Sequence, residues 1–197
     1  MTQRRRARIG ILGGTFNPIH LGHLLIAQDA VDAARLDRVL FIPSATPPHK
    51  ALGGDVSAAH RLRMVKLAIA GDKRFAVDDL EIRRGGKSYS VDTLTELRNR
   101  HPRAEFHFII GADSLDELHL WKDARRLVRL CRFIAIARPG YRGKPARIPG
   151  LRYRLLRAHP CDIASRDIRA RAAQGKSICY LVPEAVVRYI RTQKLYQ

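Results

Sequence analysis

The chain lacks the features that mark membrane-spanning, secreted and metal-clustered proteins. None of its apolar runs approaches the ~20 residues that cross a bilayer, and its first residues lead into a strand-like run without an apolar signal segment. Its only cysteines, Cys131, Cys161 and Cys179, lie far apart and follow no metal-ligand spacing. Internal repeats, low-complexity tracts and an obvious linker are also missing. These absences predict a reduced, cytoplasmic protein with no membrane partner and no metal held by protein ligands.

Acidic residues are scarce as well, with 18 Asp and Glu against 37 Lys and Arg, so the formal net charge is +19. Such a charge favours an acidic partner, either a nucleotide with several phosphates or a nucleic acid. Arginine is nevertheless spread along the whole chain, as on an ordinary solvated surface. Aromatic residues make up only 7% and are scattered, whereas proteins that bind single strands interleave them with basic residues. Charge alone therefore decides little.

What is present is a regular alternation of strand-like and helix-like segments along 197 residues, 46% of them hydrophobic. The predicted strands are 8–12, 39–42, 75–82, 106–110, 132–137 and 153–158. The predicted helices are 21–34, 58–70, 90–100 with Ser90 as its cap, two short pieces within 113–130, and 166–174 and 183–194 at the C-terminal end. This order predicts one α/β domain over residues 1–197, a Rossmann-like doubly wound parallel sheet with helices on both faces and a C-terminal helical segment. Ligands of such sheets bind beyond the carboxyl ends of the strands.

The turn after the first strand carries the strongest motif, which runs from Gly13 to His23 and reads GGTFNPIHLGH. Its paired glycines let the backbone approach a phosphate closely. It is neither the dinucleotide G-x-G-x-x-G fingerprint nor a phosphate loop with lysine. Instead, His20 and His23 are three residues apart, so they lie on one face of an opening helical turn whose N-terminus favours anions. Gly22 between them leaves room for a bulky ligand.

This motif resembles the signature of the H-x-G-H nucleotidyltransferases, and specifically of the bacterial nicotinate-mononucleotide adenylyltransferases. Further segments similar to that family's follow in the same order, namely Pro47–Lys50, Ser88–Leu94, Phe108–Ser114 with Trp121, Ile163–Arg169 and Leu181–Val186. Ala164 and Arg166 depart from the family pattern, which has small hydroxylated residues at both places. The resemblance covers the length of the chain and implies the Rossmann-like fold.

The resemblance implies transfer of AMP from ATP to nicotinate mononucleotide, which gives nicotinate adenine dinucleotide and pyrophosphate in NAD biosynthesis. The attack would be direct and in line, without a covalent enzyme intermediate. Mg²⁺ would accompany ATP, bound mainly by phosphate oxygens and water. A homo-oligomer is compatible with the sequence, and no specific nucleic-acid partner is expected.

The resemblance also implies the site residues. The implied catalytic residues are His20, His23, Lys50 and Arg169. The implied ATP site comprises Gly13, Gly14, Thr15, Phe16, His20, His23, Gly111, Asp113, Ser165 and Arg169, completed by the helices at about residues 166–194. The implied substrate-binding residues are Thr93, Trp121, Lys122, His49 and Lys50, with Trp121 stacked on the pyridine ring. A single tryptophan is otherwise more often part of a core, and Asp113 could also cap the following helix.

Three alternatives stay open at this stage. The first is a sibling transferase that acts on nicotinamide mononucleotide, phosphopantetheine or a cytidylyl acceptor. The second is a basic nucleic-acid-binding protein with Arg4–Arg6 as an arm. The third is a catalytically inactive relative, against which the intact pair of His20 and His23 argues.

Overall fold

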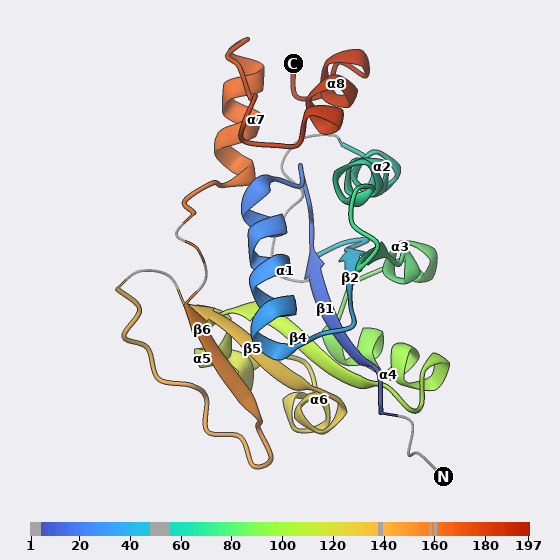
Figure 1. Cartoon of the computed structure of the whole chain (residues 1–197), viewed down its shortest axis with the longest axis vertical. Helices are drawn as coiled ribbons and strands as arrows, with labels where there is room; N and C mark the ends of the chain where they lie inside the picture. Colours follow the sequence, from blue (N-terminus) through green and yellow to red (C-terminus); the bar gives the residue numbers. More distant parts are fainter. Residues whose placement is uncertain (1–4, 48–55, 138–139, 158, 160) are drawn as a thin grey trace. The chain divides into compact units, whose positions relative to one another are not determined.

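Six strands form one sheet in the order β3-β2-β1-β4-β5-β6 in the computed structural model, which describes residues 5–47, 56–137, 140–157, 159 and 161–197 (Figure 1). The strands are β1 (Arg8–Gly14), β2 (Arg38–Pro43), β3 (Phe75–Val77), β4 (Glu105–Gly111), β5 (Arg132–Ala137) and β6 (Tyr153–Arg157). Strand β4 pairs in parallel with β1 and β5, and β5 pairs in parallel with β6. In this register Phe108 lies opposite Ile11 and Phe133, and all three side chains are buried. Parallel pairing therefore brings several strand carboxyl ends to one edge.

The contacts of the chain divide it into two compact units. The first unit comprises Met1–Leu12, Ala27–Leu40 and Tyr89–Pro160, and the second comprises Gly13–Ile26, Phe41–Ser88 and Cys161–Gln197. Strands β1 and β2 and helix α1 (Leu21–Ala34) each begin in one unit and end in the other. That the chain acts as one domain stays a prediction.

The first unit holds α4 (Ser90–Arg100), α5 (Ala112–Asp116), the 3₁₀ turn η1 (Leu118–Leu120) and α6 (Ala124–Leu130). Helices α4 and α6 pack against each other, and α5 packs on β4 and β5 (Figure 1). The interior of β4 and β5 is apolar, with Phe106, Ile109, Phe133 and Ile134 nearly inaccessible to solvent. Burial on both faces explains why these strands read as continuous hydrophobic runs.

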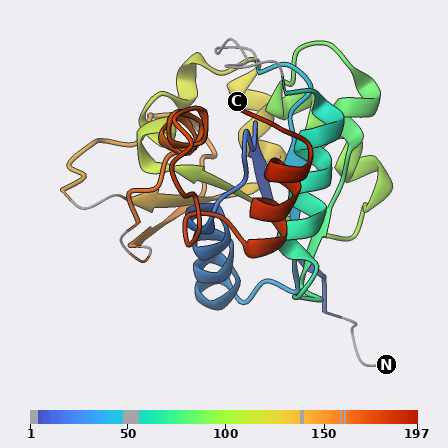
Figure 2. The same ribbon diagram turned by 90° about the horizontal axis from the view of Figure 1, so that it is seen from above.

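The second unit holds α2 (Ala58–Ile69), α3 (Leu80–Arg84), α7 (Ser165–Ala173) and α8 (Glu184–Thr192). Figure 2 shows α2 and α8 side by side, and His60 Nδ1 lies 2.8 Å from the Tyr189 hydroxyl between them. Ser57 caps α2, where its hydroxyl accepts from the His60 backbone N–H. No helix in the described part of the chain is long and apolar enough to cross a bilayer.

Three local predictions are wrong. The expected strand 75–82 ends at Val77, because Asp78 accepts a hydrogen bond from the Leu80 backbone N–H at 3.0 Å and α3 starts there. Ser90 does not cap α4, since Tyr89 holds the N-cap position and Ser90 is the first helical residue. The segment 113–130 forms three short helical pieces, α5, η1 and α6, where two were expected.

Candidate active site

The turn between β1 and α1 wraps around the ring of Phe16. Phe16 has a left-handed backbone conformation (φ 50°) and is 2% exposed. Its ring packs on Phe41 with the centroids 6.0 Å apart and meets the His23 ring edge-on at 5.1 Å. A Cβ atom at Gly14 would lie 3.1 Å from the Phe16 ring, so this position suits glycine. The predicted residues Gly13 and Gly14 end β1, and Thr15 and Phe16 follow them directly, so all four are consecutive residues of the second unit.

His20 and His23 lie together at the start of α1, as the spacing predicts. Their ring centroids are 3.7 Å apart with 31° between the planes. The His20 backbone N–H donates to His23 Nδ1 at 3.2 Å. Because Nδ1 of His23 accepts this hydrogen bond, the single proton of the neutral ring sits on Nε2. His20 Nδ1 is buried and has no hydrogen-bond partner among the described residues.

Burial keeps both imidazoles neutral at physiological pH. It lowers the pKa of His20 from 6.5 to about 4. Burial, with a smaller contribution from His20, lowers the pKa of His23 to about 3. A Cβ atom at Gly22 would come within 3.3 Å of His20 ring atoms and of the Cys161 Sγ, so glycine preserves the space beside the pair. The site therefore offers neutral N–H donors rather than imidazolium cations.

Arg61 on α2 is a site residue that the motifs do not reveal. Its side chain is fully buried and donates from Nη1 to the Thr15 carbonyl at 2.8 Å and from Nη2 to the Ala45 carbonyl at 3.2 Å. Burial lowers the pKa of this guanidinium. A single side chain thereby joins the turn after β1 to the segment after β2. The signal in the sequence is its place on the stripe with the buried Met64, Val65 and Ile69, at helical spacing.

The C-terminal segment holds the carbonyl groups of the same turn. The Ser165 hydroxyl donates to the Pro18 carbonyl at 2.9 Å, and Arg169 Nη1 donates to the Asn17 carbonyl at 2.8 Å. The Tyr196 hydroxyl donates to Asn17 Oδ1 at 2.6 Å. Ser165 and Arg169, which the resemblance implies as phosphate ligands, thus bind the protein's own turn. A guanidinium has five N–H donors, so Arg169 keeps donors for a ligand, whereas the Ser165 hydroxyl has only one.

Three of the predicted substrate-binding residues, Thr93, Trp121 and Lys122, lie in the first unit. Trp121 meets Phe108 edge-on at 6.2 Å, while Lys122 donates to Asp92 Oδ2 at 2.9 Å and lies over the Tyr89 ring at 4.4 Å. Thr93 is 1% exposed, and its hydroxyl lies 3.3 Å from the Tyr89 carbonyl. Tyr89 and Asp92 also belong to the Ser88–Leu94 segment, in which the resemblance implies only Thr93 as a site residue.

Gly111 and Asp113 mark the carboxyl end of β4 in that unit. Gly111 is the N-cap of α5, and Asp113 is exposed in its first turn. The position suits hydrogen bonding to ribose hydroxyls, as the resemblance implies. His49 and Lys50 lie outside the described residues. No cluster of three or more His, Cys, Asp or Glu side chains that could hold a metal occurs among the residues that the structure describes.

Comparison with known proteins identifies the family. The cytidylyltransferase-like family model matches residues 11–171. A protein of Pelobacter propionicus, described as a probable nicotinate-nucleotide adenylyltransferase, is 45% identical over 96% of this chain and 98% of its own length. A protein of Syntrophotalea carbinolica with the same description is 47% identical over 96% and 97%. This chain belongs to the nicotinate-nucleotide adenylyltransferase family.

Solved structures show that the chain has the family's fold. A nicotinic acid mononucleotide adenylyltransferase of Plasmodium falciparum complexed with NaAD matches with a TM-score of 0.79 at 21% identity, over 97% of this chain and 98% of that one. The same adenylyltransferase complexed with APC matches with a TM-score of 0.76 at 20% identity, again over 97% and 98%. These matches confirm the predicted Rossmann-like α/β fold.

Proposed function

We propose that this adenylyltransferase moves AMP from ATP onto the phosphate of nicotinate mononucleotide by direct in-line attack, with pyrophosphate as the leaving group. The observation that carries the proposal is the pair of buried, neutral imidazoles beside a glycine-rich turn, in a chain that belongs to this family. The attacking phosphate monoester has a second pKa near ~6 and is already ionised at neutral pH. Catalysis then requires placing two anions in line and stabilising the charge that develops on the departing oxygens.

His23 is the donor to the α-phosphate in this proposal. Its Nε2–H is the free end of a ring whose Nδ1 is held by the His20 backbone. A preorganised donor of this kind stabilises the transition state without reorganising during the reaction. His20, stacked 3.7 Å away, donates to the same phosphate chain. Neutral donors suit this role because two cationic rings at that distance would repel each other.

Arg61, Ser165 and Arg169 fix the shape of the turn by binding its carbonyl groups. With these oxygens engaged, the backbone N–H groups and imidazoles of the turn are left to face the phosphates. The remaining N–H groups of Arg169, together with Lys50, hold the β- and γ-phosphates. The imidazole, guanidinium and hydroxyl donors around the turn suit phosphate better than a hard cation, so Mg²⁺ would be held through ATP oxygens and water. Bound in that way, Mg²⁺ would neutralise charge on the leaving pyrophosphate.

Thr93, Trp121 and Lys122 of the first unit bind the acceptor. Trp121 stacks on the pyridine ring, Lys122 supplies a positive charge and Thr93 anchors the mononucleotide, while Asp113 accepts hydrogen bonds from the ribose hydroxyls of ATP. The related Plasmodium falciparum structure complexed with NaAD supports a dinucleotide product of this class. We expect the enzyme to act in the cytoplasm.

Isotope and stereochemical labelling test this function. With ATP labelled at the α-phosphorus, the label should move to nicotinate adenine dinucleotide and never remain on the protein. With a chiral α-thiophosphate, one in-line displacement predicts inversion at phosphorus. Retention of configuration at phosphorus would show a covalent intermediate and contradict the mechanism. A labelled protein that passes its label to the acceptor would do the same.

A further inference from the structure

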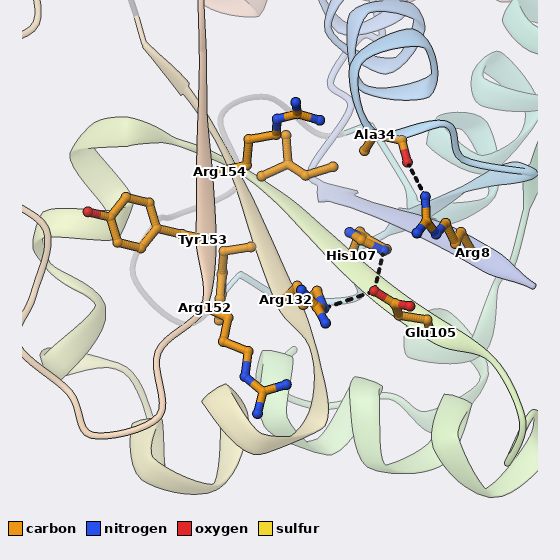
Figure 3. Close-up of a pocket in the computed structure, with 10 residues that line it drawn as sticks. Arg8, Ala34, Glu105, His107, Arg132, Arg152, Tyr153 and Arg154 are labelled. Carbon is orange, nitrogen blue, oxygen red and sulfur yellow. Dashed lines mark hydrogen bonds and ion pairs between the residues drawn. The ribbon is translucent and has the colours of Figure 1, made fainter. Parts of the chain in front are cut away.

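A polar cavity lies in the first unit, at the amino ends of β1, β4, β5 and β6 (Figure 3). Its volume is about 260 Å³, and it is lined by Arg8, Ala34, Glu105, His107, Arg132, Phe133, Ile134, Arg152, Tyr153 and Arg154. Four of these residues are the first residues of β1, β4, β5 and β6. The predicted ATP residue Gly111 ends β4, six residues beyond Glu105. At ~3.3 Å per residue the two ends of that strand are about 20 Å apart, so the cavity is distinct from the proposed active site.

The lining of the cavity is strongly basic, with four arginines against the single carboxylate of Glu105. Each of three arginines is anchored through one nitrogen. Arg8 Nη1 donates to the Ala34 carbonyl at 3.4 Å, Arg154 Nη1 donates to the Ala33 carbonyl, and Arg132 Nε donates to Glu105 Oε1 at 2.8 Å. Since a guanidinium carries five N–H donors, most N–H groups of these three arginines remain available to a ligand. Figure 3 shows Arg152 and Tyr153 extending away from His107.

His107 sits among these groups and is 8% exposed. Its Nε2 lies 3.2 Å from Glu105 Oε1, yet it has no hydrogen bond of normal geometry. Burial lowers the pKa of His107, while Glu105 opposes the shift and Arg132 and Arg8 add to it. A buried polar atom without a hydrogen bond costs free energy unless a ligand or water satisfies it. Among the residues that the structure describes, His107 Nε2 therefore has only the Glu105 carboxylate beside it, and it makes no hydrogen bond of good geometry.

We propose that this cavity is a binding site for a small phosphate-bearing anion, separate from the site of adenylyl transfer. Guanidinium groups bind phosphate through paired charge-assisted hydrogen bonds, and Arg8, Arg132 and Arg154 surround the space with unused donors. The bound oxygen also satisfies His107 Nε2. The volume falls just below the ~300–1,000 Å³ of sites for drug-sized ligands, which selects pyrophosphate-sized anions rather than whole dinucleotides.

The first test is a titration of the wild-type protein with inorganic phosphate and with pyrophosphate. A non-hydrolysable ATP analogue is kept at saturation so that the active site is occupied. Histidine ring resonances are followed by NMR. The His107 signals should shift and saturate, whereas those of His101, exposed in the same unit, should stay in place. A His107 signal that does not respond to either anion would overturn the proposal.

A pair of charge-matched variants gives the second test. The Arg132→Gln/Arg154→Gln variant should weaken pyrophosphate binding at least tenfold by calorimetry under the same conditions. The control, Arg125→Gln/Arg129→Gln, removes equal charge from exposed positions on α6 and should leave binding within about twofold. Equal weakening in both variants would mean diffuse attraction to a basic protein and no site. If the first variant fails to fold by circular dichroism, the wild-type titration decides.

Discussion

At the residue scale, the two histidines at the start of α1 are in contact and buried, and a backbone hydrogen bond to Nδ1 fixes the tautomer of His23. The motif spacing predicted their contact, because residues three apart share a helix face. Their neutrality could not be read from the sequence, since it arises from the packing of Phe16 and the rest of the turn around them. In the proposed mechanism, this neutrality suits His23 to donate a hydrogen bond to the α-phosphate rather than to act as a counter-ion.

Removal of the His23 donor should affect turnover more than ATP binding. We expect His23→Ala to lower kcat by ~10²-fold or more, as for loss of one preorganised donor, with a smaller rise in the KM for ATP. Steady-state kinetics of pyrophosphate release measure both, with circular dichroism as the check on folding. Near-normal turnover in a folded variant would remove His23 from the mechanism.

The same histidines should make folding stability depend on pH. Below pH 6.5 the unfolded chain takes up protons at these rings, whereas the folded protein does not until pH falls to about 4 and below. The free energy of unfolding should therefore fall between pH 6.5 and 4, by up to about 1.4 kcal/mol per pH unit for each histidine. Urea unfolding at several pH values measures the slope. His20→Asn/His23→Asn should flatten it, and an unchanged slope would refute the pKa assignment.

We expect Arg61 to act through the turn rather than on the substrate, because its side chain is fully buried and donates to the carbonyls of Thr15 and Ala45. We expect Arg61→Met to lower kcat/KM for ATP at least about tenfold, since an unpaired carbonyl lets the turn relax. The matched control is Arg63→Met, an exposed position on the same helix, which should change little. If the two variants behave alike in kcat and KM, Arg61 has no positioning role.

At the scale of elements, the sequence predicted β1, β4, β5 and α1 well. Buried parallel strands appear in the sequence as continuous apolar runs, and glycines mark the ends of β1 and β4. It failed at α3, where Asp78 turns a strand-like run into a helix start through one side-chain hydrogen bond. It also missed Arg61, because an arginine in an amphipathic helix is ordinarily solvated. Only the tertiary contacts with Thr15 and Ala45 reveal its burial.

Arg166 and Arg169 lie three residues apart on helix α7, and we expect them to differ in role. Arg169 binds the Asn17 carbonyl, while the Arg166 side chain is 85% exposed and lies 3.5 Å from Asp167. Arg166→Ala should change the KM for ATP by no more than about threefold. That is well below the tenfold change that corresponds to ~1.4 kcal/mol of binding free energy. Arg169→Ala should raise it far more. Comparable KM defects would instead place Arg166 in the ATP site.

At the scale of the whole molecule, the strong basic charge is compatible with anionic substrates but does not identify them. The net charge of +19 is spread over the chain, and the residues proposed for catalysis contribute little of it. The order of motifs along the sequence predicted the family and the fold, since both depend on the entire chain. The cavity around His107 was not predicted, because it forms only when the amino ends of four strands come together.

The most direct test of the central claim is pyrophosphate release by the purified protein with ATP and Mg²⁺, measured with nicotinate mononucleotide, with nicotinamide mononucleotide and without an acceptor. We predict release that depends on the acceptor, with a higher kcat/KM for the nicotinate form, whose carboxylate suits the basic side chain of Lys122 beside Trp121. Equal rates or a preference for the amide would contradict the specificity. No release with either mononucleotide would contradict the proposed function itself.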